Sequence, residues 1–192
     1  SYDLGYKVMG SHKEEHFFTQ VGLEERNITM LPFNKDNIKE GYTIVQGNAF
    51  GDENEEVRRA KELNLKIYSY QEMIAELTND TKLIAISGCH GKTTTTTMTA
   101  KIFENVGINY LIGDGTGYGK EGNEYFALEA CEFRRHFLSY NPYISVITNV
   151  ELDHTDYYKD LDDVKDAFTS FANKARHYAV ICGDDENARS LD

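Results

Sequence analysis

Short apolar runs alternate with longer segments of helical spacing along most of the chain. Many of the apolar runs are β-branched and uninterrupted by charge, which is typical of strands covered on both faces. This alternation predicts an α/β fold with parallel sheets and helices on both sides. The predicted strands are Tyr6–Met9, Thr29–Leu31, Thr43–Gln46, Lys66–Tyr68, Leu83–Ile86, Tyr110–Ile112, Tyr125–Leu128, Ile144–Thr148 and Tyr178–Ile181. The predicted helices are His16–Arg26, Asn54–Leu63, Tyr70–Glu76, Thr93–Val106 and Leu161–Ala175.

A polar patch near Asn79–Thr81 interrupts the alternation and predicts a domain boundary. We therefore expect one domain at residues 1–79 and a second at residues 80–192. The first five residues have the pattern of a last helical turn, with Gly5 as its left-handed cap. Both ends of the sequence are expected to fall inside domains.

Residues 83–97 carry the clearest chemical signal. An apolar run ends at Ser87-Gly88, and Gly91-Lys92-Thr93 then opens a segment of helical spacing. Amides at a helix N-terminus are unpaired and the helix dipole is positive there, so such a turn binds phosphate. Lys92 would add a charge near the terminal phosphates, and the Thr93 hydroxyl would ligate a phosphate-bound Mg²⁺. The sequence therefore predicts a nucleoside triphosphate site.

The spacing of this turn is shorter than that of the common phosphate loop, because two residues rather than four separate Gly88 from Gly91. A plain glycine turn with an incidental surface lysine is the alternative. The run of threonines that starts at Thr93 favours a functional turn, since β-branched residues are mediocre helix formers. Residues 95–97 are expected to be packing or surface positions. Cys89 lies in the turn and is interpreted as a structural cysteine; the alternative is a reactive thiol whose pKa the helix N-terminus lowers.

Composition narrows the class of protein. The chain has 192 residues and a formal net charge of −12, which argues against non-specific binding to nucleic acid or anionic lipid. The sequence contains no apolar stretch of membrane-spanning length and no visible secretory leader. Its three cysteines lack disulfide or zinc spacing and fit a reducing cytoplasm. The sequence gives no indication of the oligomeric state.

Two further strands end in polar residues. The strand at 125–128 runs into Glu129, with a second carboxylate, Glu132, three residues on. The strand at 144–148 runs into a segment that contains Asn149 and His154. Because ligands bind at the carboxyl ends of parallel strands, we expect Glu129 and His154 beside the phosphate turn. A solvated glutamate and a capping histidine are the alternatives.

Two further segments each have two possible interpretations. The glycine-rich segment 113–119 is either a mobile loop over the site or a connector. The sequence Arg134-Arg135-His136 either supplies positive charge for an anionic substrate or is a solvated basic cluster.

Three ordered motifs resemble the Mur ligase family. They are Gly-Cys-His-Gly-Lys-Thr-Thr-Thr at 88–95, Glu-Ala-Cys-Glu at 129–132 and Thr-Asn-Val-Glu-Leu-Asp-His at 148–154. The sequence Leu-Gly-Tyr-Lys-Val-Met-Gly-Ser at 4–11 also resembles the first domain of that family. The resemblance implies a Rossmann-like, UDP-sugar-binding domain that lacks its first strand and glycine loop. It also implies a truncated ATPase domain of the phosphate-loop type with a parallel sheet.

The resemblance is strongest to members that add L-alanine to UDP-N-acetylmuramate with ATP and Mg²⁺. In these enzymes the substrate carboxylate attacks the γ-phosphate, and the amine then displaces phosphate from the acyl phosphate. The protein supplies charge neutralisation and positioning rather than a nucleophile. The resemblance implies phosphate binding by Gly88, Cys89, His90, Gly91, Lys92, Thr93 and Thr94, metal ligation by Thr93, Glu129 and His154, catalysis by Lys92, Glu129 and His154, and substrate contacts by Ser11, His12 and Asn149.

The chain also departs from the family pattern. His12 stands where the family has an acidic residue, which leaves uridine recognition at this position open. The C-terminal, amino-acid-binding domain of the family lies outside the 192 residues, so this chain alone is expected to be inactive. One alternative is a Mur-family ligase for another carboxylate, such as a murein peptide recycling ligase. The others are a non-catalytic nucleotide-binding module and a kinase-like phosphate-loop protein, which predicts the common loop spacing.

Overall fold

The computed structural model describes residues 2–13 and 21–191, and the chain divides into two compact units. The first unit comprises residues 1–74 and the second comprises residues 75–192. Helix α3 (Tyr70–Thr78) carries the chain from one unit into the other. None of the helices in the described residues combines the length and apolarity that a membrane crossing requires.

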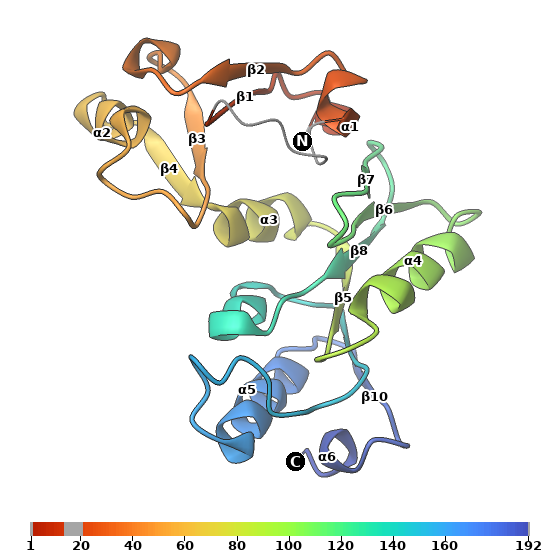
Figure 1. Cartoon of the computed structure of the whole chain (residues 1–192). Helices are drawn as coiled ribbons and strands as arrows, with labels where there is room; N and C mark the ends of the chain where they lie inside the picture. The colour runs from red at the N-terminus through yellow and green to blue at the C-terminus, as the bar shows by residue number, and fades with distance from the viewer. Residues whose placement is uncertain (1, 14–20, 192) are drawn as a thin grey trace. The chain divides into compact units, whose positions relative to one another are not determined.

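The first unit contains two separate pairs of parallel strands (Figure 1). β1 (Met9–His12) pairs with β2 (Thr29–Pro32), and β3 (Thr43–Gln46) pairs with β4 (Lys66–Ser69). The short helix η1 (Tyr2–Leu4) precedes β1, and α1 (Val21–Glu24), η3 (Lys35–Asn37) and α2 (Glu55–Glu62) lie between successive strands. The part of the predicted helix His16–Arg26 that falls on residues 16–20 lies outside the described residues.

Local capping explains two of the boundaries in this unit. The Asn54 side chain accepts hydrogen bonds from the amides of Glu56 and Val57, so Asn54 is the N-cap and α2 begins at Glu55, one residue after the predicted start. The Gly5 amide donates to the Tyr2 carbonyl at 2.9 Å, and Gly5 has a positive φ of 83°, as its predicted capping role requires. β1 begins at Met9 rather than Tyr6, because its extent is set by pairing with β2.

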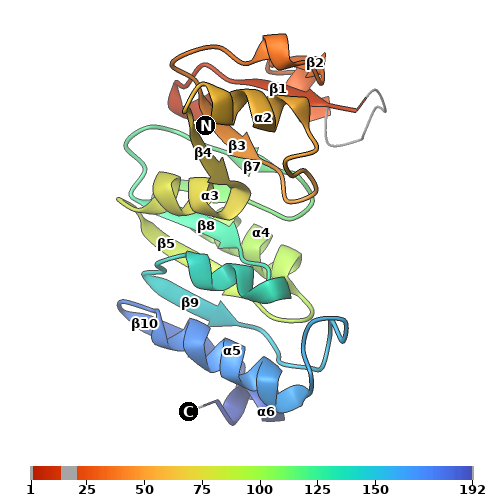
Figure 2. The same cartoon turned by 90° about the vertical axis from the view of Figure 1, so that its left-hand side faces the viewer.

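The second unit is built on one six-stranded sheet with the order β10-β9-β5-β8-β6-β7. Its strands are β5 (Lys82–Ser87), β6 (Ile108–Leu111), β7 (Gly117–Tyr118), β8 (Tyr125–Glu129), β9 (Ile144–Ile147) and β10 (Tyr178–Ile181). All neighbours pair in parallel except β6 and β7. Helix α4 (Lys92–Ile102) lies on one face, and η4 (Phe133–Ser139) and α5 (Leu161–Asn173) lie on the other (Figures 1 and 2). α6 (Glu186–Arg189) follows the last strand.

The core of this unit fixes the central strands and the helices around them. β5 is the most buried strand, and its side chains Leu83 and Ile86 are fully buried. On the α5 face, the Phe137 ring stacks on Phe171 with centroids 4.7 Å apart and meets Phe168 edge-on at 5.2 Å. The predicted α/β class, with mainly parallel sheets, is confirmed. β7, η3, η4 and α6 were not predicted, because each is a short element in a polar or glycine-rich segment.

Candidate nucleotide and metal site

The carboxyl ends of three neighbouring strands form the candidate site. β9, β5 and β8 lie side by side in parallel, and backbone hydrogen bonds continue past their ends. The Ala130 amide donates to the Ile86 carbonyl at 2.8 Å, and the Thr148 amide donates to the Ser87 carbonyl at 3.0 Å. The segments that follow all three strands are therefore held against one another, as the sequence predicted.

The turn between β5 and α4 depends on two glycines. Gly88 has a φ of +141°, and a Cβ placed there would lie 2.1 Å from Thr148 Oγ1 and 3.1 Å from the Asn149 backbone. Gly91 is the N-cap of α4, with a φ of +78° and no side-chain cap. The first amides of α4 are therefore not capped by the side chain that usually fills this role.

Residues after β9 brace this turn. The Asn149 amide oxygen accepts from the His90 N–H at 2.9 Å, and its nitrogen donates to the His90 carbonyl at 2.9 Å. Thr148 Oγ1 donates to the same carbonyl at 2.6 Å. The structure thus places Asn149 against the turn, where its amide orients the His90 peptide.

Cys89 has the environment of a structural cysteine. It is buried, and its sulfur donates to the Glu151 carbonyl and accepts from the Glu151 amide, both at 3.2 Å. Burial raises the pKa of the Cys89 thiol to about 11. This desolvation outweighs the lowering that a helix N-terminus would give.

Lys92 is held inside the turn. Its ammonium donates to the Gly88 carbonyl at 2.5 Å and to the Cys89 carbonyl at 3.4 Å. It also contacts both carboxylate oxygens of Glu132, at 3.2 and 3.1 Å. Glu132 is only 2% exposed, so this is a buried ion pair. The sequence marked Glu132 as a second carboxylate after Glu129 but did not assign it to the site.

Thr93 and Glu129 meet at the start of α4. The Thr93 hydroxyl donates to Glu129 Oε1 at 3.2 Å, and the Gly113 amide donates to Glu129 Oε2 at 2.8 Å. The glycine-rich segment 113–119 therefore touches this carboxylate through its first residue. A hydroxyl and a carboxylate are ligands that suit Mg²⁺, so this pair fits one of the predicted metal contacts.

His154 lies in a cluster with two carboxylates. One ligand atom from each of Glu132, Asp153 and His154 falls within 4.8 Å of the others. His154 Nε2 is 3.5 Å from Glu132 Oε1, and its ring lies 4.7 Å from the Phe133 ring. Glu132 thus joins the predicted metal residue His154 to Lys92. Its oxygen Oε2 contacts the Lys92 ammonium at 3.1 Å as an ion pair, and no hydrogen bond of normal geometry reaches it in the described part of the chain.

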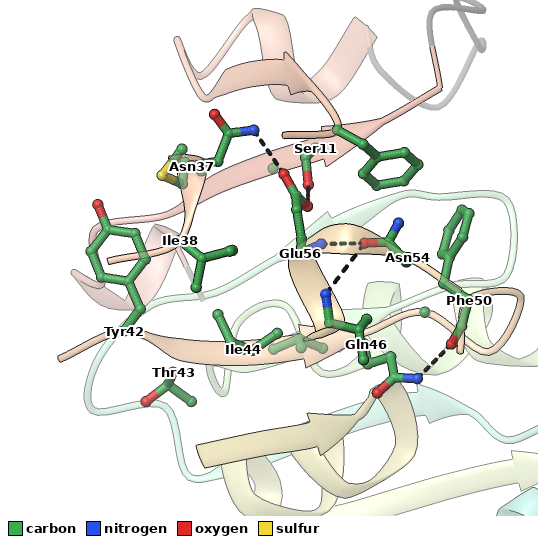
Figure 3. Close-up of a pocket in the computed structure, with 16 residues that line it drawn as sticks. Ser11, Asn37, Ile38, Tyr42, Thr43, Ile44, Gln46, Phe50, Asn54 and Glu56 are labelled. Carbon is green, nitrogen blue, oxygen red and sulfur yellow. Dashed lines mark hydrogen bonds between the residues drawn. The ribbon is translucent and has the colours of Figure 1, made fainter. Parts of the chain in front are cut away.

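Ser11 and His12 lie in the first unit, on β1. The Ser11 hydroxyl donates to the Glu56 carboxylate, which also accepts from the Asn37 side chain at 2.7 Å (Figure 3). The Asn34 backbone amide donates to the same carboxylate at 3.1 Å. Ser11 lines a cavity of about 310 Å³ between β1 and β3. Among the described residues that line this cavity, Glu56 is the one charged side chain.

The fold and the arrangement at the sheet edge define an α/β protein with a phosphate-binding type of turn. A family model described as the Mur ligase middle domain matches residues 86–192, and one described as the Mur ligase family, catalytic domain matches residues 2–82. The chain belongs to the Mur ligase family. Members of this family are ATP-dependent amide ligases that act in peptidoglycan-related synthesis.

Solved structures of Mur ligases share this fold. UDP-N-acetylmuramate-alanine ligase MurC from Thermotoga maritima is 26% identical, with a TM-score of 0.79 over 96% of this chain and 45% of its own. The UDP-N-acetylmuramate:L-alanyl-gamma-D-glutamyl-meso-diaminopimelate ligase from Neisseria meningitides is 23% identical, with a TM-score of 0.77 over 97% of this chain and 67% of its own. A murein peptide ligase from Psychrobacter arcticus is 24% identical, with a TM-score of 0.69 over 89% of this chain and 42% of its own. The chain therefore spans between 42% and 67% of the length of these structures.

Proposed function

We propose that this chain is the UDP-sugar-binding and nucleotide-binding part of a ligase that joins L-alanine to UDP-N-acetylmuramate, with ATP and Mg²⁺. The observation that supports this most directly is the pair of acidic contacts at the phosphate turn. Glu129 meets Thr93 at 3.2 Å, and Glu132 meets Lys92 at 3.1 Å, both at the carboxyl edge of the sheet. The similarity to MurC over 96% of this chain supports UDP-N-acetylmuramate as the acceptor.

The residues of the candidate site would bind three groups: the phosphates of ATP, Mg²⁺ and the acceptor substrate. The amides of residues 88–94 and the Lys92 ammonium would bind the terminal phosphates, because both donors project from one turn. Thr93, Glu129 and His154 would hold Mg²⁺, which neutralises charge between two anionic reactants when it is bound. Asn149 would keep the His90 peptide oriented and contact the substrate from the same turn. Glu132 would keep the Lys92 ammonium in position through their ion pair until a nucleotide phosphate binds that ammonium instead.

The open edges of the first unit support a first domain that takes one more strand. β1 and β3 each pair on one side, and the cavity lies between them (Figure 3). Its walls include Met9, Ile44 and Val57, and among the described lining residues there is no lysine or arginine. An apolar parallel strand fits this cavity better than a diphosphate does, because a buried diphosphate needs positive donors. The domain limits at 1–79 and 80–192 remain our proposal, and the division of the chain into two compact units supports it. Three free thiols, Cys89, Cys131 and Cys182, support a reducing cytoplasm.

A ligase for a murein peptide is the second candidate, because two of the similar structures carry that activity in their names. In the full-length protein, phosphate release from ATP with UDP-N-acetylmuramate should depend on L-alanine and not on the tripeptide L-alanyl-γ-D-glutamyl-meso-diaminopimelate. The reverse dependence would favour the second candidate. Binding of nucleotide without any phosphate release would instead indicate a non-catalytic module.

Two substitutions test the assigned roles. Lys92→Ala and His154→Ala should each lower alanine-dependent phosphate release at least about 100-fold, since each removes a charge or a ligand at the reacting phosphate. Lys101→Ala is the matched control, because Lys101 is on the same helix and its side chain is 76% exposed. Near-normal turnover in either site variant, with the fold retained, removes that residue from the mechanism.

A further inference from the structure

Two adjacent arginines follow the buried Glu132 in an uncommon backbone conformation. Arg134 has a φ of +50° and Arg135 a φ of +58°, both in the left-handed region that L-residues rarely occupy. Such strain persists where surrounding contacts over-determine it, and it collects at functional sites. The side chains of Arg134 and Arg135 make different contacts, which distinguish their roles in this turn.

Arg135 supplies the contacts that hold the turn. Its guanidinium donates to the Asp163 carboxylate at 2.6 Å and to the Asp166 carboxylate at 2.7 Å. It also donates to the Asp163 carbonyl at 3.3 Å. Three bonds to α5 therefore occupy Arg135, and this arginine has a structural role.

Arg134 is presented in a different way. It is exposed, and its guanidinium lies 5.2 Å from the Phe133 ring centroid. The Phe133 ring in turn lies 4.7 Å from His154 and 6.1 Å from Tyr157. Within residues 2–13 and 21–191 the structure records no ion pair for Arg134. The turn thus displays one cation, packed against an aromatic ring that also contacts the imidazole of the candidate metal site.

The charge of Arg134 is permanent and local. Burial, and secondarily the charge of Arg134, lowers the pKa of the neighbouring His136. His136 is therefore neutral near pH 7, and Arg134 alone carries the positive charge displayed by this turn. The chain as a whole has a net charge of −12, so its overall field does not attract anions. Because salt screens charges over short distances, Arg134 attracts an anion only at short range.

The phosphates of ATP already have donors in the amides of the turn and in Lys92. The acceptor in the proposed reaction carries a carboxylate and a diphosphate, so it also needs a cation. We propose that Arg134 binds an anionic group of this acceptor, a carboxylate or a phosphate, and sets the affinity of the enzyme for it. This inference rests on the proposed function, since the acceptor is the UDP-linked acid of that reaction.

The test uses the full-length protein, with steady-state kinetics for UDP-N-acetylmuramate and for ATP. Arg134→Ala should raise the KM for UDP-N-acetylmuramate by about tenfold or more, as expected for loss of a charged hydrogen bond. Its kcat and its KM for ATP should change less than about twofold, because the reacting phosphate is held elsewhere. Arg134→Lys should lie between, since lysine keeps the charge and loses the planar fork.

Arg135→Ala is the matched control, because it removes the same charge one residue away. It should lower the melting temperature, whereas Arg134→Ala should leave it unchanged. An unaltered acceptor KM in Arg134→Ala would overturn the inference, and so would an increase confined to the KM for ATP. If the unmodified protein releases no phosphate in response to UDP-N-acetylmuramate and L-alanine, the proposed function fails and this inference fails with it.

Discussion

At the scale of single residues, Glu132 and Glu129 are three positions apart and have different surroundings. Glu132 is 2% exposed and pairs with Lys92, whereas Glu129 is half-buried and accepts from a hydroxyl and an amide. Removing one partner of a buried ion pair leaves an uncompensated charge. Glu132→Ala should therefore lower the free energy of unfolding by about 3 kcal/mol, at the lower end of the range because Lys92 retains some access to water.

Glu129→Ala provides the comparison. It deletes two ordinary hydrogen bonds at a partly exposed position, so we expect a loss of about 1–2 kcal/mol. Urea unfolding followed by circular dichroism measures both variants. Equal losses would show that the Lys92–Glu132 pair is solvated in solution and has no special energetic role.

The second residue-scale prediction concerns Cys89 and pH. Burial raises the pKa of its thiol from 9.0 to about 11, so the folded state disfavours the thiolate. At pH 8 the thiolate is then about 100-fold scarcer than in an unfolded chain, and alkylation by iodoacetamide should slow by about that factor. The raised pKa also makes stability depend on pH. The contribution of the buried, protonated Cys89 thiol to the free energy of unfolding is fully present below pH 9 and is lost as the pH rises towards 11.

Mass spectrometry of tryptic peptides, with and without urea, gives the rate for each cysteine. The unfolded chain is the control, since all three thiols are then solvated. Rapid labelling of Cys89 in the native protein at pH 8 would contradict a buried structural thiol.

Sequence reasoning at this scale succeeded where strand ends fix position. Glu129 follows a parallel strand beside β5, so the topology alone brings it next to Thr93. It noted Glu132 but did not assign it to the site, because Glu132 lies three residues past the end of β8, where strand topology no longer fixes the direction of a side chain. It also assigned Asn149 to substrate alone, since nothing local predicts that its amide meets the His90 backbone.

At the scale of elements, the β5–α4 turn is specified by close packing as well as by its glycines. An alanine at residue 88 would need a φ near +141° and would place its Cβ 2.1 Å from Thr148 Oγ1. Backbone strain and overpacking together should cost about 3 kcal/mol or more. Gly88→Ala should also abolish binding of an ATP analogue in a calorimetric titration, because the turn must shift.

Gly122→Ala is the matched control for this prediction. Gly122 also has a positive φ, of 87°, but no atom lies within 4 Å of the added Cβ. Its cost should be about 1 kcal/mol, from backbone strain alone. Similar effects at the two positions would mean that the fit against Thr148 does not constrain the turn.

Hydrogen bonds within helix α4 show how its unusual threonines are accommodated. The hydroxyls of Thr96, Thr97 and Thr99 each donate to the carbonyl four residues earlier, at 2.8 Å. Thr96 is fully buried and Thr97 is exposed, as expected for packing and surface positions. Elements with strong local patterns, such as β3 and β10, were predicted to the residue. The start of β1 was not, because register with β2 rather than local sequence defines it.

At the scale of the whole molecule, the described residues of the first unit form two parallel strand pairs, which belong to separate two-stranded sheets. Each pair leaves one strand, β1 or β3, with an unpaired edge on the cavity of about 310 Å³. Unpaired edges bind further strands, and the walls here are mainly apolar. A hexapeptide rich in valine and isoleucine should therefore bind saturably to this chain and raise its melting temperature.

Fluorescence polarisation of the labelled peptide measures this binding, and two controls identify the site. The same peptide with a central proline lacks one amide donor and should bind at least about tenfold more weakly, since a ladder hydrogen bond is lost. Ile44→Lys, which adds a charge to the cavity wall, should also weaken binding. UDP should not compete, because the described lining offers no cation to a diphosphate. Competition by UDP would instead identify the cavity as the nucleotide pocket, and the unpaired edges would then be spanned by a ligand rather than by a strand.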